Sequence, residues 1–498
     1  MDILHKIKRI VRGTACRCTS KTAIALFCCL AVLLQPVMAV AVSAGGNDEM
    51  TYREYLEEQI SEYSRFINSL SLENGALTMY SPVISNTFDV STLPEIDGVS
   101  PEEYTGWRSG TVVPYFSEIA VLGLLKAAPD ESRETAAGFI DWYFGKLNTA
   151  QSDVNGVDGT VYDYYVFVDP ADPSRIVETP RSHDYDSTDS YAACFIRVLR
   201  EYYRVYGDSS LFEDRREDFD RIVSAMFATY SPDVDLTGAK PDYMVCYLMD
   251  NCEVYDGCVA ASELYESVFG DRQKAAELSS KARAVANGIE EHLYNGAAGN
   301  YYAYCHPNGQ CDAPSDWETF YADATCQLYP AIFGLINPED ERAQTLYKTF
   351  NEHYKKEGRD WTKLTHGDSY PWATICRAAA VMGDTDSVLA YTDTMYRTYV
   401  RRGMPYPIYN SEAGQMMYAL AILLESGDLE LDTPMGGQDQ SSAESKEPAT
   451  SDEQSHVSSP EGGSNIPLVA AIASAGVILA AVAGYIIVKL SKRPKEEK

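Results

Sequence analysis

Acidic residues lie directly before or just inside several apolar segments of this chain, at Asp186, Asp189, Glu253, Glu318 and Asp323. Taken singly, each has a structural explanation, because an acid in the first turn of a helix stabilises it by about 0.3 to 1 kcal/mol. Glutamate is a poor cap, however, and acids at the start of a buried helix are rare unless they face water or a partner. We therefore interpret the group as a cluster that faces a ligand.

Two carboxyl groups on either side of a glycosidic bond are enough to hydrolyse it. One protonates the leaving oxygen, and the other activates water or attacks the sugar carbon. The spacing along the chain does not give the distance between two carboxyl groups, so the residues alone leave open which of these acids would form such a pair.

Aromatic residues accompany the acids in the same segments. Aromatic faces with carboxylates and few basic groups suit sugars, because sugar rings stack through their C–H faces and offer hydroxyl donors. Each aromatic residue alone is equally well explained by packing, but together they favour a carbohydrate cleft. We predict that it is lined by Trp107, Tyr115, Trp317, Trp372 and His366. The sequence predicts neither a metal site nor a cofactor.

The elements that must position these residues form a repeat. An apolar block that begins with a tyrosine recurs six times, and each block is apolar or small on nearly all faces, as in a helix buried on every side. The block tyrosines are Tyr115, Tyr191, Tyr255, Tyr321, Tyr370 and Tyr409. Amphipathic helical segments alternate with the blocks, at 51–70, 131–148, 211–230, 272–294, 338–354 and 386–400.

This alternation predicts an all-α fold, an (α/α)6 toroid with six inner helices inside six outer ones. Inner helices that are reached through the same kind of connection run parallel, so their N-terminal ends meet at one face. We expect the long segments that precede the buried helices to be loops on that face, at 71–113, 149–187, 231–252 and 295–318.

Residues 52–428 resemble the six-hairpin glycosidases. The repeated inner-helix pattern carries the resemblance, above all in the segments DSTDSYAACFIRVLREYYRVYGD (186–208) and TFYADATCQLYPAIFGLINPEDERA (319–343). This (α/α)6 superfamily includes glucoamylase-like and unsaturated-glucuronyl hydrolases. The resemblance implies a glycoside hydrolase with an acid pair at the mouth of the inner helices, which maps onto Asp189 and Glu318 as catalytic residues. Asp186, Glu253 and Asp323 are the reserves for this pair and are expected to bind the substrate. A non-catalytic glycan-binding or cell-envelope protein on the same fold is the alternative.

Both ends of the chain have the pattern of membrane targeting. Residues 1–44 combine basic residues, an apolar run and small residues, as in a signal peptide. Residues 466–488 are uncharged and long enough to cross a bilayer. The basic tail 489–498 that follows predicts a cytoplasmic C-terminus.

Residues 45–431 remain for the toroid domain, and we expect it to be extracellular and held at the cell membrane by one helix. Between domain and helix, residues 432–465 are acidic and contain no aromatic residue, which predicts a disordered stalk.

The chain carries 41 basic against 73 acidic residues, a net charge of −32. Such a field repels nucleic acid but not neutral sugars, so we expect a carbohydrate or polysaccharide partner and no nucleic acid. Outside the cell, Cys305 and Cys311 in the segment CHPNGQC are candidates for a local disulfide.

Overall fold

The structure is a computed structural model of the 498-residue chain and describes residues 50–84, 100, 104, 106–312, 315–427 and 430–435. The predicted signal peptide, transmembrane segment and basic tail, and most of the predicted stalk, lie outside the described residues. In the described part of the chain, we find no helix with the length and apolar character needed to span a membrane.

The described residues belong to two compact units. The small unit combines residues 50–52 with 432–435, where Thr51 and Pro434 form an antiparallel bridge and the Met435 amide donates to the Met50 carbonyl at 2.8 Å. Residues 53–431 form the large unit, which contains every feature discussed below.

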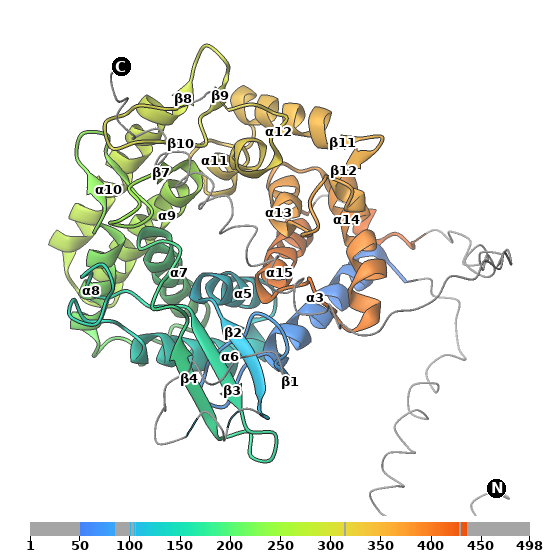
Figure 1. Cartoon of the computed structure of the whole chain (residues 1–498). Helices are drawn as coiled ribbons and strands as arrows, with labels where there is room; N and C mark the ends of the chain where they lie inside the picture. The colour runs from blue at the N-terminus through green and yellow to red at the C-terminus, as the bar shows by residue number, and fades with distance from the viewer. Residues whose placement is uncertain are drawn as a thin grey trace, which may run out of the picture. The chain divides into compact units, whose positions relative to one another are not determined.

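A closed ring of inner helices forms the centre of the large unit (Figure 1). Each inner helix contacts the next one along the chain, and the last contacts the first. The inner helices are α5 (Pro114–Ala127), α7 (Asp189–Tyr206), α9 (Leu248–Ser267), α11 (Tyr329–Ile332), α13 (Ala373–Val381) and α15 (Asn410–Glu425). The toroid predicted from the repeat is therefore the observed arrangement.

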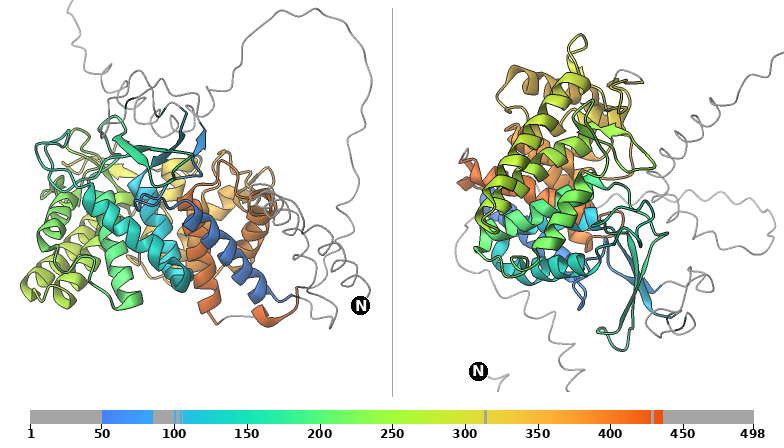
Figure 2. Two further views of the ribbon diagram at one scale, coloured as in Figure 1. Left: turned by 90° about the horizontal axis from the view of Figure 1, so that it is seen from below. Right: turned by 90° about the vertical axis from the view of Figure 1, so that its left-hand side faces the viewer.

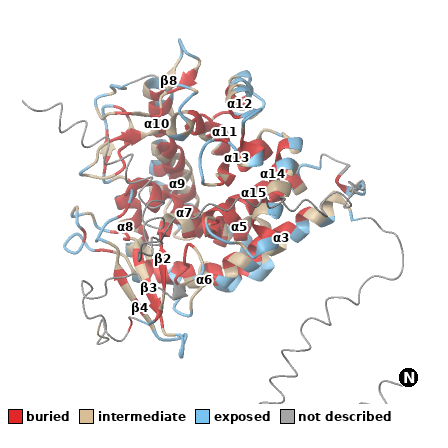
Figure 3. Cartoon of the chain, turned by 45° about the vertical axis from the view of Figure 1, so that its right-hand side comes forward, coloured by how far each residue is buried: buried red, intermediate tan, exposed pale blue. Residues whose placement is uncertain are grey.

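Amphipathic helices surround this ring and alternate with the inner helices along the chain. Each of them overlaps a segment predicted as amphipathic. They turn a buried stripe inward and an exposed face outward (Figure 3). On α12, for example, Leu346, Phe350 and Tyr354 are buried. The outer helices are α3 (Tyr52–Ser69), α6 (Pro129–Gly145), α8 (Arg216–Met226), α10 (Arg272–Gly288), α12 (Glu341–Tyr354) and α14 (Thr385–Thr398).

The inner helices run parallel, as their N-terminal contacts show. Tyr115 near the start of α5 stacks on Tyr191 near the start of α7, with ring centroids 5.8 Å apart. The amide of Ala373, the first residue of α13, donates to the Glu412 carboxylate in the first turn of α15 at 2.5 Å. Neighbouring N-terminal ends thus meet at one face, which we call the mouth of the ring.

Two glycines allow the ring to close between α5 and α15. A Cβ added to Gly123 would lie 2.3 Å from the Gly414 carbonyl oxygen, and one added to Gly414 would lie 2.5 Å from the Ile119 carbonyl oxygen. No side chain fits at such distances, so glycine at both positions lets the two backbones pack directly against each other.

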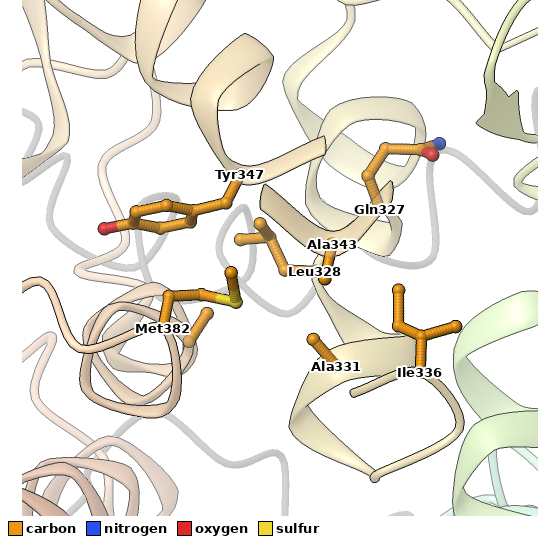
Figure 4. Close-up of a pocket in the computed structure, with 8 residues that line it drawn as sticks. Gln327, Leu328, Ala331, Ile336, Ala343, Tyr347 and Met382 are labelled. Carbon is orange, nitrogen blue, oxygen red and sulfur yellow. The ribbon is translucent and has the colours of Figure 1, made fainter. Parts of the chain in front are cut away.

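The fourth inner helix is shorter than predicted. Its block forms a π-helical turn, η4 (Phe320–Ala324), followed by the four-residue helix α11. Pro330 lies inside the block. In a continuous helix it would lack the N–H donor for the backbone hydrogen bond, and its ring would clash with the carbonyl four residues earlier, so the helix is interrupted before it. Beside the short helix, between α11, α12 and α13, a small apolar crevice remains, lined by Leu328, Ala331, Ile336, Ala343, Tyr347, Ala378 and Met382, with Gln327 at its edge (Figure 4).

The third block also begins earlier than predicted. Helix α9 starts at Leu248, so Tyr255 lies two turns inside the helix rather than at its start. The first turn instead contains Asp250. This shift moves Glu253 one turn below the mouth.

Most of the β-structure lies in the long segments predicted as loops, and it is gathered at one end of the helices (Figure 2). An antiparallel sheet with the order β1-β2-β3-β4 leads into α5 and α7; its strands are β1 (Val83–Ile84), β2 (Arg108–Val112), β3 (Tyr164–Val168) and β4 (Ile176–Pro180). Short antiparallel pairs complete the face: β5 (Tyr230–Ser231) with β6 (Leu236–Thr237), β7 (Cys246–Tyr247) with β10 (Tyr304–Cys305), β8 (Tyr294–Asn295) with β9 (Asn300–Tyr301), and β11 (Lys355–Lys356) with β12 (Arg359–Asp360). Single turns occur at η3 (Ile289–Leu293), η5 (Trp361–Lys363), η6 (Val400–Arg402) and η7 (Glu430–Asp432).

Candidate active site

Four carboxyl groups gather where α7 and α9 open onto the mouth. Asp186 lies in the loop before α7 and Asp189 is the first residue of α7, while Asp250 and Glu253 occupy the first two turns of α9. Burial raises the pKa of Asp250 well above its usual value, and the charges of Asp189, Glu253 and Asp186 raise it further. These four residues, which we call the acid cluster, therefore act on one another electrostatically.

Asp250 and Asp186 are the members of the acid cluster that solvent reaches. Asp250 is half-buried and Asp186 is exposed, and within the described part of the chain neither carboxyl group has a hydrogen bond or ion pair to another side chain. The surrounding protein nevertheless removes enough water to raise the pKa of both. A group that is accessible and yet desolvated is expected on the wall of a concave site.

Lys240 separates the ionisation of these two acids. Its ammonium group lowers the pKa of Asp186 and so opposes the effect of desolvation, but it is not among the charges that act most strongly on Asp250. Lys240 is held in place by Asp184 at 3.0 Å and by the Tyr185 carbonyl at 3.1 Å. The charge of Lys240 therefore favours the ionised form of Asp186 more than that of Asp250.

Asp189 does not occupy the accessible position that its predicted catalytic role requires. Its side chain is fully buried, one carboxylate oxygen accepts from the Ser190 amide at 2.8 Å, and burial raises its pKa to about 7. This burial disfavours direct contact with a substrate, and the catalytic role of Asp189 stays a prediction. The charge of Asp189 also raises the pKa of Asp250.

The predicted binding residues Glu253 and Tyr115 are brought together. The Tyr115 hydroxyl donates to Glu253 Oε1 at 2.7 Å. Glu253 is 3% exposed, and burial raises its pKa to about 7 against the opposing effects of Tyr115 and Arg197. Glu253 is therefore a buried member of the acid cluster, and its hydrogen bond to Tyr115 connects it to the first turn of α5 at the mouth.

Below the acid cluster, buried arginines neutralise one further acid. Arg197 and Arg200 bind Asp256 at 2.6 and 2.7 Å. Although burial alone would raise the pKa of Asp256, these two guanidinium groups lower it to about 2. Glu118, in contrast, is fully buried, and its pKa is raised well above its usual value by burial and by the charge of Glu253.

Glu318, predicted as the second catalytic acid, lies elsewhere on the rim. It is exposed and pairs with Arg359 at 3.2 Å and with His353 Nδ1 at 3.2 Å, and Trp317 stacks on His353 at 6.1 Å. The block begins with the turn η4, so Glu318 precedes a turn and not an inner helix. Glu318 is not among the charges that act most strongly on Asp189 or Asp250.

Three other predicted residues stand apart from the acid cluster. Trp107 is 6% exposed within a cluster of Tyr104, Phe167 and Val177, and His366 is 1% exposed with its Nε2 atom 2.9 Å from the Tyr370 carbonyl. Neither ring offers a face to a ligand. Asp323, in η4, is half-buried, and burial and the charge of Asp316 raise its pKa.

A chain of neighbouring aromatic rings runs along the mouth from the start of α7 to η4. They come from the N-terminal ends of α7, α5, α15 and α13 and from η4, and we call them the aromatic arc (Figure 1). Successive centroids lie 5.8 Å (Tyr191–Tyr115), 5.9 Å (Tyr115–Phe116), 6.0 Å (Phe116–Tyr409), 5.3 Å (Tyr409–Tyr370), 5.6 Å (Tyr370–Trp372) and 4.8 Å (Trp372–Tyr321) apart.

Tyr321 joins the aromatic arc to the acid cluster. It is 43% exposed, and its pKa is raised by desolvation and by the charges of Asp186, Asp250 and Glu253. The predicted ligand contacts Tyr115 and Trp372 both belong to the arc. The sequence analysis missed Asp250. The signal that could have found it is the apolar run 246–249 directly before it, which indicates that the helix starts earlier than predicted.

Solved glycosidase structures are among the matches to this chain. No protein-family model and no curated sequence matches the chain. Among solved structures, a glycosidase variant with a single tyrosine-to-phenylalanine substitution is 14% identical with a TM-score of 0.48, over 74% of this chain and 96% of that chain. An alpha-amylase from Clostridium perfringens is 10% identical with a TM-score of 0.45, over 74% and 98%.

A rhamnosidase from Klebsiella oxytoca with rhamnose bound is 10% identical with a TM-score of 0.43; the match covers 74% of this chain and 64% of the rhamnosidase. At these identities and TM-scores, the three structures identify no member family for this chain. The assignment of the fold rests on the ring of helix contacts described above.

Proposed function

We propose that this protein is a glycoside hydrolase whose acid pair is Asp250 and Asp186. One observation carries the proposal: within a cluster of carboxyl groups at the mouth of the ring, these two are accessible to solvent, and the pKa of each is raised by the surrounding protein. Paired acids whose environments separate their ionisation are the arrangement that glycosidic hydrolysis needs.

Asp250 is the proton donor in this proposal. Desolvation and the charges of Asp189, Glu253 and Asp186 favour its neutral form at neutral pH. A neutral carboxyl group can deliver its proton to the glycosidic oxygen as the bond to the sugar carbon breaks. The proton then resides on the departing hydroxyl group, and Asp250 is left ionised.

Asp186 is the ionised partner. Lys240 lowers its pKa relative to what desolvation alone would produce, and its exposure leaves room for water or for the sugar carbon. As a carboxylate it either accepts a proton from the attacking water or attacks the sugar itself, and in both cases its charge stabilises the positive charge that develops on the sugar ring.

The remaining groups position the substrate and the donor. Tyr321 and Trp372 present aromatic faces beside the acid cluster, at 4.8 Å from each other, as a platform for a sugar ring. Asp189 and Glu253 hold Asp250 in its neutral form and are positioning residues. Glu318 has no part in the proposed chemistry.

The location of the protein belongs to the same proposal. Export through residues 1–44 and anchoring through 466–488 would hold the domain outside the cell, where glycans are met. The strongly acidic composition supports a neutral or weakly charged sugar as substrate.

The proposal is tested by release of reducing ends from a panel of glycans. Asp250→Asn and Asp186→Asn should each lower kcat by about 10² to 10⁴, while binding of the glycan, measured by calorimetry, persists. Glu318→Gln is the matched control and should retain full activity. Loss of activity in Glu318→Gln, or its retention in Asp250→Asn, would overturn the assignment; binding without turnover across the whole panel would favour a non-catalytic glycan-binding protein.

A further inference from the structure

Two cysteines far apart in the sequence lie directly opposite each other on paired strands. Strands β7 and β10 are antiparallel, and their register sets Cys246 against Cys305 and Tyr247 against Tyr304. Opposite residues of an antiparallel pair have Cα atoms about 4.5 to 5.5 Å apart, which is within the range of about 4.4 to 6.8 Å that a disulfide needs.

The two thiols also interact with each other. A hydrogen bond to Cys246 is the largest influence on the Cys305 thiol and raises its pKa. Both side chains are fully buried, so no other ligand competes for the sulfur atoms. In this structure both are present as thiols.

Cys311, the partner expected for Cys305 from sequence proximity, is directed elsewhere. Its Sγ atom donates to the His292 carbonyl at 3.5 Å, and the residue is half-buried. The segment between Cys305 and Cys311 folds as a turn closed by the bond from the His306 amide to the Gln310 carbonyl at 2.9 Å. The strand register therefore favours Cys246 over Cys311.

We propose that Cys246 and Cys305 form a disulfide bond when the protein folds in an oxidising compartment. Each thiol loses its proton, and the two electrons pass by thiol–disulfide exchange to an incoming disulfide, of a protein oxidant or of glutathione, which leaves as two thiols. The exchange takes place while β7 and β10 are pairing, because the sulfur atoms are buried afterwards. The inference depends on export of the domain and not on the hydrolase activity.

Such a bond would fix the end of α9 that carries the proton donor. Cys246 precedes Asp250 by a single turn of chain, and the Leu248 amide, the first of α9, already donates to the Ala303 carbonyl on the β10 side at 2.9 Å. A covalent link at the same place would restrain the position of Asp250 relative to the loop 294–312.

The test maps the thiols of the full-length chain. Membranes from cells that export the protein are denatured with an alkylating agent and no reductant, and the digest is analysed by mass spectrometry. In a second arm, reduced full-length protein in mild denaturant is oxidised with glutathione disulfide. We expect one linked peptide pair, Cys246 with Cys305, in both arms. A Cys305–Cys311 link, or full alkylation of Cys246 and Cys305 in both arms, would overturn the proposal.

Thermal stability provides a second test, because the oxidised and reduced forms of the same wild-type protein can be compared. Closing a loop of about 60 residues should lower the unfolding equilibrium constant by about a thousandfold, so reductant should lower the Tm of the oxidised wild type by several degrees. Cys311→Ser should keep this response and Cys246→Ser should lose it. An equal response in Cys246→Ser would contradict the assignment. Glycan turnover measured in parallel separates this result from the proposed function.

Discussion

Asp189 and Asp250 stand at the starts of neighbouring inner helices, and the charge of the first raises the pKa of the second. Asp189 has no exposed surface, whereas Asp250 is half-buried at the mouth. The two acids thus divide the roles that the sequence assigned to one residue: Asp250 is open to a ligand, and Asp189 sets its ionisation.

Removing the charge of Asp189 should change the pH dependence of activity. Asp189→Asn deletes a charge that raises the pKa of Asp250, so Asp250 should lose its proton at lower pH. We expect the alkaline limb of the kcat/KM profile to move to lower pH by about half a unit or more. A profile with the limb unmoved would mean that Asp189 does not act on the donor. Glu318→Gln, which leaves the acid cluster unchanged, should have the wild-type profile.

Shortening the aromatic arc should weaken substrate binding more than chemistry. Trp372→Ala removes a ring that lies 4.8 Å from Tyr321, and the lost stacking should raise KM about threefold to tenfold with a smaller change in kcat. Trp107→Phe is the matched control. Because Trp107 is buried in a separate cluster, this variant should lower the Tm and leave KM unchanged; the reverse pattern would place the sugar at Trp107.

The buried acids make stability fall as pH rises. Burial raises the pKa of Glu253 from its usual value near 4.5 to about 7, so the folded state binds this proton more tightly than the unfolded state. The free energy of unfolding is therefore higher below pH 4.5 and declines up to about pH 7, by about 3 kcal/mol for this group. Asp256, with a pKa lowered to about 2, has the opposite effect, and its contribution is lost only below about pH 4.

Glu253→Gln tests this linkage. The amide oxygen can still accept from Tyr115, but the side chain no longer titrates, so the unfolding free energy measured in urea should vary less between pH 5 and pH 8 than in the wild type. An identical slope in the variant and the wild type would assign the pH dependence to other groups.

The seam of the ring should tolerate no side chain. Gly414→Ala adds a methyl group 2.5 Å from the Ile119 carbonyl oxygen, and we expect a loss of about 1 to 3 kcal/mol or more in unfolding free energy. Gly145→Ala, at the end of α6, meets no atom within 4 Å and should change stability by less than about 1 kcal/mol. Equal effects of the two substitutions would mean that α5 and α15 separate without cost.

The helical repeat and its layers could be read from the sequence. Burial on all faces in the tyrosine blocks and a single apolar stripe in the segments between them are local properties, and they predicted both the inner and the outer helices. The sequence also contains Pro330 within the fourth block, but the shortening of this block to the helix α11 was seen only in the structure. The predicted signal and membrane segments remain predictions.

The site could be read only in part. The sequence predicted that acids and aromatic residues meet at the mouth, and Asp186, Glu253, Tyr115 and Trp372 lie there. It could not show the different surroundings of the predicted pair. Asp189 and Glu318 stand at similar distances from their block tyrosines, yet Asp189 is buried in α7 and Glu318 is exposed before η4.

The sequence by itself determined which segments form helices and which faces are buried, because periodicity and composition act over a few turns of one element. Only the tertiary structure decided which acid is accessible, which is neutralised and which cysteine lies opposite another. Accessibility, desolvation and strand register depend on atoms from several helices at once, and no local pattern records them.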